Sequence, residues 1–365
     1  MNDLLDFSSY KNVLANKAFV VDKTKGRKRD DLILDSDLIY SEHGVSPLII
    51  DLLKLSHSKM YRRSSHKTQV FSSRYVDPYI RTRMSHQHEI AANGLIAADV
   101  LGLNKDLVLV GGLGHDCGHV VFGHTGEYFF SEKLGKEFRH EVYVCVVSEF
   151  IERHNKQLRI NCGLNMLYET LECWRMHSRG KKELVTATGV TEEANLIMYQ
   201  DKFYIFPDMD DAKNKKYIDD DPQPFNELGQ NQRERTQRCL FALIQESAES
   251  GRVIFEKSKE AKLFLECKKF MYDLYEKINN KEGQYLIAML EKVYKALSES
   301  RDLGGINPIL MMSLMVEEDI YRLVEISNIT IEDIMRTSLK GIIKNIQACN
   351  NDIDITSFDL CNYIK

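Results

Sequence analysis

Histidine and carboxylate side chains gather between residues 80 and 127 in a pattern that suits a metal ion. His86 is followed by the adjacent pair His115 and Asp116, and all 11 histidines of the 365-residue chain fall before residue 178. Imidazole with carboxylate suits Mn, Fe, Zn or Co, and Mg where a phosphate group helps to hold it. An isolated His-Asp dipeptide is usually a chance occurrence at a helix end, but five histidines between positions 86 and 124 predict a divalent metal site.

A second pair, His124 and Glu127, has the residue types of an acid–base pair. The two lie three residues apart, so the carboxylate can fix the tautomer of the imidazole and raise its basicity. An imidazole held in this way can give a proton to a leaving oxygen or take one from an attacking water, which is worth typically about 10²–10⁴ in rate.

Helices are predicted to position these residues. One helix is expected to carry His86 and to run to about Leu101. A second is expected to be capped at Asn104, to contain a buried apolar run, and to deliver His115, Asp116 and His119. No alternating strand pattern of any length is found, so the predicted fold class is all-α.

Two segments carry a resemblance to a known family. RTRMSH, which ends at His86, and GHDCGHVVFGHTGE, which ends at Glu127, resemble the HD-domain phosphohydrolases. Within that superfamily they are similar to the deoxynucleoside triphosphate triphosphohydrolases, the dGTPase-like group. Val120-Val121 replaces two prolines or Gly-Pro of the family pattern, which changes the stiffness of the loop and not its chemistry. The resemblance covers roughly residues 45–275 and implies an HD-domain helical core.

The resemblance also implies roles for individual residues. Three of the expected metal ligands are His86, His115 and Asp116. The expected catalytic residues are His119, His124, Glu127 and His140. Triphosphate contacts are expected from Arg83, Lys268 and Lys269, with Arg62 or Arg63 reaching a phosphate or a base. Tyr204, Asp208 and Tyr275 are expected to meet the rest of the substrate, with Tyr204 packed on the sugar.

The last metal ligand is the informative departure from the family pattern. Aligned on Tyr204 and Asp208, the position of the family aspartate is Gln200, which is neutral and a weaker ligand than a carboxylate. Asp201 follows directly, about 100° further round a helix. Either Asp201 completes the site, or Gln200 stands there and the metal is held weakly or not at all.

Composition limits the cellular context. The formal net charge is -5, so the surface as a whole does not attract nucleic acid, although residues 61–67 form a local basic stretch. No apolar run reaches about 18 residues, so no membrane span is expected. The N-terminus lacks the features of a signal peptide, and the eight cysteines include no C-x-x-C. A cytoplasmic protein with reduced thiols is expected.

The chain divides into three expected parts: an N-terminal segment of residues 1–45, an HD-domain core of 46–275, and a helical C-terminal region of 276–365. Residues 213–235 are polar, contain two prolines, and are expected to form a loop or flap. No chemistry is expected from residues 300–365.

The favoured hypothesis is metal-dependent hydrolysis of dGTP, or of dNTPs more broadly, to deoxynucleoside and inorganic triphosphate. The alternatives are an HD phosphohydrolase that acts on another nucleotide or a signalling nucleotide, and a nucleotide-binding sensor with an impaired metal site. By the same resemblance a homo-oligomer and an allosteric nucleotide are expected.

Overall fold

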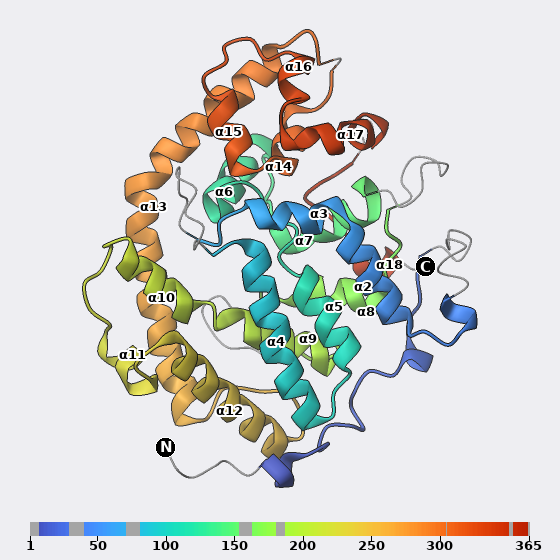
Figure 1. The fold of residues 1–365 in the computed structure, drawn as a ribbon, viewed down its shortest axis with the longest axis vertical. Helices are drawn as coiled ribbons and strands as arrows, with labels where there is room; N and C mark the ends of the chain where they lie inside the picture. The colour runs from blue at the N-terminus through green and yellow to red at the C-terminus, as the bar shows by residue number, and fades with distance from the viewer. Residues whose placement is uncertain are drawn as a thin grey trace.

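The computed structural model describes residues 7–28, 40–70, 81–152, 163–179, 187–303, 305–349 and 353–363. Its regular structure within these ranges is helical (Figure 1), apart from one isolated antiparallel bridge between Thr68 and Thr82. The all-α prediction is confirmed. In the described residues no helix is both long and apolar enough to cross a membrane.

The helices follow one another along the chain with short connections. In order they are α2 (Pro47–His57), α3 (Lys59–Arg63), α4 (Arg83–Leu101), α5 (Lys105–Gly114), α6 (Gly123–Leu134), α7 (His140–Val146), α8 (Tyr168–Met176), α9 (Glu192–Lys202), α10 (Ile205–Asn214), α11 (Gln223–Leu228), α12 (Gln232–Ser250), α13 (Lys259–Glu299), α14 (Pro308–Leu314), α15 (Glu317–Leu323), α16 (Ile331–Ile334), α17 (Ile343–Cys349) and α18 (Leu360–Tyr363). A π-helical turn, η5 (Val147–Ile151), continues α7, and short 3-10 turns stand elsewhere.

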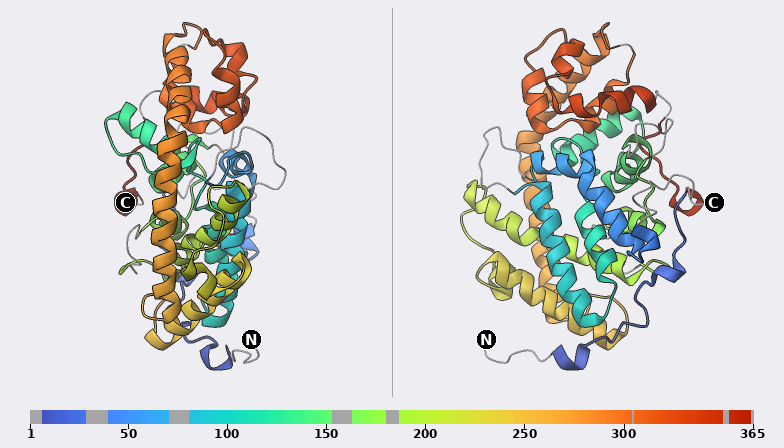
Figure 2. Two further views of the ribbon diagram at one scale, coloured as in Figure 1. Left: turned by 90° about the vertical axis from the view of Figure 1, so that its left-hand side faces the viewer. Right: turned by 45° about the vertical axis from the view of Figure 1, so that its right-hand side comes forward.

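The longest helix, α13, joins two hydrophobic cores. Its first half, from Ala261 to Leu274, packs in a core with α9, α10 and α12. Its second half, from Met289 to Leu297, packs in a core with α5 to α8 and the C-terminal helices. Figure 2 shows α13 running the length of the molecule, with α14 to α17 at one end.

Close packing around α5 places the end of that helix in the middle of the molecule. A Cβ atom built on Gly112 would come within 2.9 Å of the Ala91 backbone in α4, and one on Gly114 within 2.3 Å of the Trp174 ring in α8. Trp174 is fully buried. Because the glycines have no side chain, both neighbouring helices reach the backbone of α5 where it leads into His115.

Two predicted helix boundaries are confirmed: the Asn104 side chain accepts a hydrogen bond from the backbone N–H of Leu107, and α4 ends at Leu101. The side chain of Thr191 caps α9 by accepting from the N–H of Ala194. Gly102 follows α4 in the left-handed conformation, with φ of 81°.

One predicted helix ends earlier than expected. The helix after Asn104 stops at Gly114, and tight turns follow in which the N–H of His119 donates to the carbonyl of Asp116. A Cβ on Gly118 would lie 2.1 Å from the His140 carbonyl oxygen, so these turns run directly against the start of α7. Further along the chain, α9 stops at Lys202 and α10 starts at Ile205, so Asp201 and Asp208 lie on different helices.

The segment expected to be a loop at residues 213–235 is partly helical, with α11 inside it and α12 starting at Gln232. The C-terminal residues form a group of short helices, α14 to α18, as expected. The boundary proposed at residue 275 falls inside α13, which runs through that point without a break.

Candidate active site

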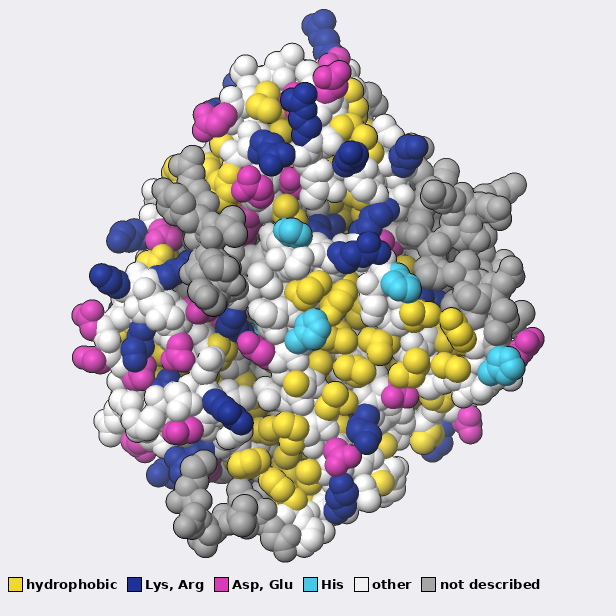
Figure 3. All heavy atoms as spheres, viewed as in Figure 1, with side chains coloured by type: hydrophobic (Ala, Val, Ile, Leu, Met, Phe, Trp, Pro, Cys, Tyr) yellow, Lys and Arg dark blue, Asp and Glu magenta, His cyan; other side chains and the backbone are white. Residues whose placement is uncertain are grey.

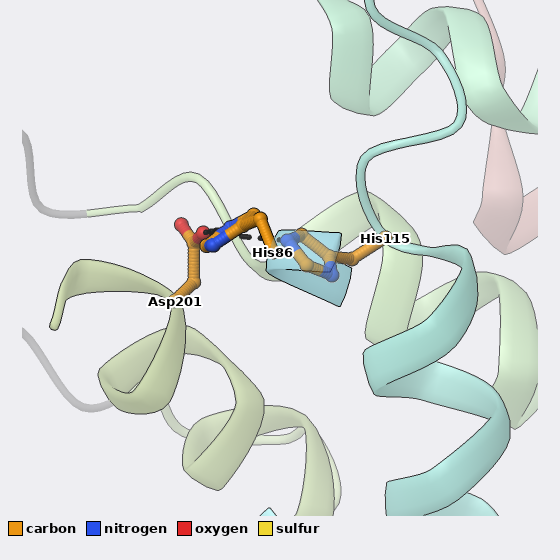
Figure 4. Close-up of side chains that lie close together, drawn as sticks. All are labelled: His86, His115 and Asp201. Carbon is orange, nitrogen blue, oxygen red and sulfur yellow. Dashed lines mark hydrogen bonds and ion pairs between the residues drawn. The ribbon is translucent and has the colours of Figure 1, made fainter. Parts of the chain in front are cut away.

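Three side chains from three helices converge at the centre of the molecule. His86 of α4, His115 at the end of α5 and Asp201 of α9 point toward one another (Figure 4). Oδ1 of Asp201 lies 3.1 Å from Nε2 of His86 and 3.3 Å from Nε2 of His115. Both histidines are fully buried, and Asp201 is 9% exposed. The three ligand atoms lie close enough together to hold one metal ion.

The hydrogen bonds of His115 leave one of its ring nitrogens available to a cation. Its Nδ1–H donates to the carbonyl of Gly112 at 2.8 Å, so Nε2 carries the lone pair. That Nε2 is buried and has no hydrogen-bond partner among the described residues. An orphaned buried acceptor is costly unless an ion fills the position, so the donor set fits a divalent cation.

Asp116 supplies the second carboxylate. Its Oδ1 lies 3.7 Å from Nε2 of His115, and its Oδ2 lies 3.9 Å from Nε2 of His86. Oδ2 also accepts a hydrogen bond of 2.8 Å from Arg83 Nη1. Burial alone would raise the pKa of Asp116, but His119, Arg83 and His115 outweigh it and hold that pKa well below the usual range. The carboxylate is therefore ionised.

The structure places Asp201, and not Gln200, against the two imidazoles. The amide oxygen and nitrogen of Gln200 are buried and make no hydrogen bond within the described residues. Burial would raise the pKa of Asp201, but the adjacent imidazoles of His115 and His86 hold it well below the usual value. With Asp116, the set therefore carries two formal negative charges, which Gln200 could not supply.

Glu127 connects two of the predicted catalytic histidines. Its Oε2 accepts from Nδ1 of His124 at 2.7 Å, and its Oε1 accepts from Nδ1 of His140 at 2.5 Å. The His140 ring stacks on that of His119, with 3.6 Å between ring centroids. The left-handed Phe122 and Gly123, with φ of 58° and 52°, begin α6 and bring His124 into its first turn.

The contacts of His140 identify it as an imidazolium. Nδ1–H donates to Glu127, and Nε2 lies 3.0 Å from Nε2 of His177. His177 donates its own Nδ1–H to the carbonyl of Trp174, so its Nε2 has only a lone pair to offer and His140 must donate there too. Burial favours neutral His140, but Glu127 outweighs it and raises the pKa to about 9. Burial lowers the pKa of His177 to about 3.

These groups open into one cavity of about 440 Å³, a size typical of small-molecule sites. One side is formed by charged groups of the metal and histidine clusters, and the other by α13 from Tyr272 to Leu286. Of the predicted residues, the cavity is lined by Arg83, Asp116, His119, His124, His140, Asp201, Tyr204 and Tyr275. His86 and His115 lie directly behind Asp201.

Two other residues predicted to contact substrate, Asp208 and Lys268, lie behind the residues that line the cavity. Asp208 is fully buried, where it accepts hydrogen bonds from Tyr275 and from Arg81 at 2.5 and 2.7 Å. Burial lowers the pKa of Lys268 to about 8, and its amino group lies 5.6 Å from the ring of Tyr272, which lines the cavity.

Two predicted contacts are not brought to the cavity. Arg62 and Lys269 are exposed and are absent from the lining of the cavity as described. Arg62 instead donates to the carbonyl of His57 at 2.5 Å. Arg62 and Lys269 miss the cavity because their side chains point outward from their helices. Their neighbours Arg63 and Lys268 point inward and are buried.

Sequence reasoning missed two residues of the site. The first is His177, whose Nε2 accepts a hydrogen bond from His140 while its own Nδ1–H donates to the carbonyl of Trp174. Lys202 lines the cavity, is 5% exposed, and has its pKa lowered by burial to about 7. The sequence position of Lys202, directly after Asp201, could have indicated its place in the site. A cation next to a carboxylate that faces the metal position suits a phosphorylated substrate.

Comparisons with known proteins agree with this arrangement. A family model described as "HD domain" matches residues 83–204. A deoxyguanosinetriphosphate triphosphohydrolase-like protein from Clostridium tetani is 33% identical over 234 residues, covering 61% of this chain and 64% of that relative, just under two thirds of its length. A second protein of that description, from Clostridium perfringens strain 13, is 30% identical over 289 residues, 75% of this chain and 80% of the relative. A third, from Desulfatibacillum aliphaticivorans, is 28% identical over 309 residues, with 82% of each chain covered.

Proposed function

The chain belongs to the HD-domain family of deoxyguanosinetriphosphate triphosphohydrolase-like proteins, and from that premise we propose that it hydrolyses deoxynucleoside triphosphates to deoxynucleoside and inorganic triphosphate. Phosphohydrolase chemistry is common to the family, whereas the substrate and the products are our proposal. The observation that carries it is the cavity itself, because one space of about 440 Å³ contains a metal-ligand set, an acid–base pair and several cations.

His86, His115, Asp116 and Asp201 would hold a divalent ion, which we propose to be Mn, Mg, Fe, Co or Zn. When bound, such an ion supplies Lewis-acid polarisation of a phosphoryl oxygen and offsets charge that develops on it. Arg83 holds Asp116 through its 2.8 Å hydrogen bond, which fixes the carboxylate for that purpose.

The triphosphate would lie against the cationic side chains of the cavity. Arg83, Lys202 and the His140 imidazolium all line it, and Lys268 stands close behind Tyr272. His119 stacks on His140 and keeps its ring in place. A triphosphate carries several negative charges, and in a poorly hydrated site these cations bind it far more strongly than they would in water.

His124 is the group that moves the proton. Glu127 accepts from its Nδ1–H, so Nε2 is the atom that exchanges protons with the substrate or water. The side chain is 61% exposed and therefore reachable from the cavity. Water oxygen forms a bond to the α-phosphorus, the bond from that phosphorus to the sugar 5′ oxygen breaks, and the 5′ oxygen leaves as a hydroxyl with a proton that originates in the water.

The deoxynucleoside would lie toward α13. Tyr204, Tyr272 and Tyr275 line that side, and the hydroxyl of Tyr204 donates to that of Tyr272 at 3.4 Å. Tyr204 is held by neighbours on both sides, since its ring also contacts His86 edge-on with 6.2 Å between centroids. A fixed ring against the sugar leaves little room for a 2′-hydroxyl, which would select deoxy over ribo substrates.

The test is incubation with each of the four dNTPs and with GTP, in Mn or Mg, followed by separation of products. Free inorganic triphosphate with the deoxynucleoside is the expected result, and His115→Ala is the inactive control. Release of pyrophosphate or of a single phosphate would instead indicate an HD phosphohydrolase acting on another nucleotide. No product from any nucleotide would reject the enzymatic proposal. The sensor alternative relied on Gln200, and Asp201 beside both imidazoles removes that reason for it.

A homo-oligomer and an allosteric nucleotide remain part of the proposal. Apolar side chains gather at the surface over α2, α4 and α5 (Figure 3). Among the exposed ones are Ile49 of α2 and Ile96 of α4, at 37% and 48% exposure. An assembly of copies of this chain would cover these side chains. Light scattering with and without nucleotide measures the mass of the assembly and so tests both parts of this proposal. We also propose a cytoplasmic location, since Cys117, Cys145, Cys173, Cys239 and Cys267 are free thiols.

A further inference from the structure

Glu317, a buried side chain of the C-terminal helices, contacts a segment that borders the active site. Glu317 is the first residue of α15, and its Oε1 accepts from the hydroxyl of Thr68 at 2.6 Å and from the backbone N–H of Thr68 at 3.3 Å. The side chain is 5% exposed, and the two residues are 249 positions apart. Both the backbone and the side chain of Thr68 are therefore fixed by the C-terminal region.

Thr68 lies in a short segment that sets the start of α4. It pairs with Thr82 in the one antiparallel bridge of the described residues. Beside it, the N–H of Arg83 donates to the carbonyl of Lys67 at 2.9 Å, and the N–H of Gln69 donates to the carbonyl of Arg81 at 3.0 Å. Arg83 is the cavity residue that holds Asp116. A shift of Thr68 would move the backbone from which Arg83 projects.

The same segment supports the loop that carries His119. The buried amino group of Lys67, whose pKa burial lowers well below its usual value, donates to the carbonyl oxygen of His119. Gln69, two residues on, lines the cavity itself. Of residues 67 to 69, the first thus contacts the loop of His119 and the last lines the cavity, and Glu317 holds the middle one.

The charge of Glu317 also suits this place. Burial raises the pKa of Glu317 by more than the hydrogen bonds from Thr68 and the charges of Arg83 and Lys67 lower it. Arg83 and Arg63 are buried cations of this region, and the buried amino group of Lys67 lies near them. An acidic group among them lowers their mutual repulsion before an anionic substrate arrives, since like charges in a poorly hydrated region repel strongly.

We propose that Glu317 is a positioning residue for the phosphate-binding side of the cavity, acting through Thr68 on Lys67 and Arg83. The C-terminal helices are then part of the catalytic unit and not only a cover over the core. The identity of the ligand in this inference rests on the proposed function. The contacts from Glu317 to Lys67 and Arg83 do not depend on it.

The experiment compares Glu317→Ala and Thr68→Val with two matched controls. Glu318→Ala removes a neighbouring acid whose side chain is 65% exposed, and Thr68→Ser keeps the hydroxyl that Glu317 accepts from. Glu317→Ala and Thr68→Val are expected to raise KM for the dNTP substrate about 10-fold with a smaller change in kcat, because displaced cations weaken binding. The controls are expected to match the wild type.

Calorimetric binding of inorganic tripolyphosphate separates this inference from the proposed function. Weaker binding in both test variants, with wild-type binding in both controls, supports the inference even if no dNTP is hydrolysed. Equal tripolyphosphate affinity and equal KM in wild type and folded test variants would overturn it. Should Glu317→Ala fail to fold, Thr68→Val alone decides, since it removes only one hydroxyl.

Discussion

Oε1 of Glu127 lies 2.5 Å from Nδ1 of His140, so the carboxylate that orients His124 also holds a second, cationic histidine. The sequence pairs Glu127 with His124 alone, three residues before it. In the fold, one carboxylate oxygen of Glu127 holds His124, the residue proposed for proton transfer. The other oxygen holds the His140 imidazolium on the proposed phosphate-binding side.

His124→Ala and Glu127→Gln are therefore expected to differ in their kinetics. His124→Ala should lower kcat by about 10²–10⁴ and leave KM nearly unchanged, because it removes only the proton-transferring ring. Glu127→Gln should lower kcat and also raise KM, because it loosens His140. The double variant should lose little more kcat than the worse single variant, since the pair acts as a unit. Steady-state kinetics decide, with Glu132→Ala as the control on α6; full additivity of the two kcat losses would refute a coupled pair.

The pKa of His140 predicts a loss of substrate affinity at alkaline pH. Burial lowers that pKa and Glu127 raises it by more, to about 9 from a usual 6.5. Because the folded value is the higher, stabilisation by the His140–Glu127 pair is fully present below about 6.5 and is lost as the pH rises through about 9. KM should rise over the same interval.

Kinetics from neutral to alkaline pH test this expectation. His140→Gln cannot carry a charge and should show a high KM already at neutral pH. Lys268→Met serves as the control, because burial lowers the pKa of Lys268 to about 8 and its titration would otherwise add to the profile. A wild-type rise in KM that persists unchanged in His140→Gln would assign the effect to another group.

Metal affinity should depend on Asp201 and not on Gln200. Asp201→Asn keeps the shape and removes a charge that lies 3.1 Å from the His86 nitrogen, so it should weaken metal binding by at least about 10-fold. Gln200→Leu should leave affinity unchanged. Metal titration of the apoprotein measures both, with His86→Ala as the positive control and His88→Ala, an exposed histidine on the same helix, as the negative one. Loss in Gln200→Leu alone would move the ligand back to position 200.

Two helical glycines are expected to respond oppositely to alanine. A Cβ on Gly114 would lie 2.3 Å from the Trp174 ring, so Gly114→Ala should destabilise the protein by about 1–3 kcal/mol. A Cβ on Gly283, inside α13, would meet nothing nearer than 3.8 Å, so Gly283→Ala should stabilise it by up to about 1 kcal/mol through helix propensity. Urea unfolding of the two variants beside the wild type gives both free energies of unfolding, and equal changes would contradict the packing around α5.

Local signals in the sequence predicted the all-α fold and the cap at Asn104, which depend on residue type and short spacing. The convergence of His86 with His115 joins two helices and was expected from their residue types and the family resemblance, not from short spacing. Pro207 marks the start of α10: proline lacks an N–H and is accommodated in the first turn of a helix, so α10 begins just before it. The contacts of Glu317 with Thr68 and of His177 with His140 join distant parts of the chain, and no local spacing specifies them.

The course of α13 through both hydrophobic cores bears on how the protein unfolds. One uninterrupted helix supplies packing side chains to each core and the wall of the cavity between them. If one core unfolded alone, the apolar side chains of half of α13 would be exposed to water. The two cores are therefore thermodynamically linked, and global unfolding should be cooperative. A ligand in the cavity contacts the shared segment, and at 100 times its Kd it would add about 2.7 kcal/mol to the stability of the whole chain and not to one part of it.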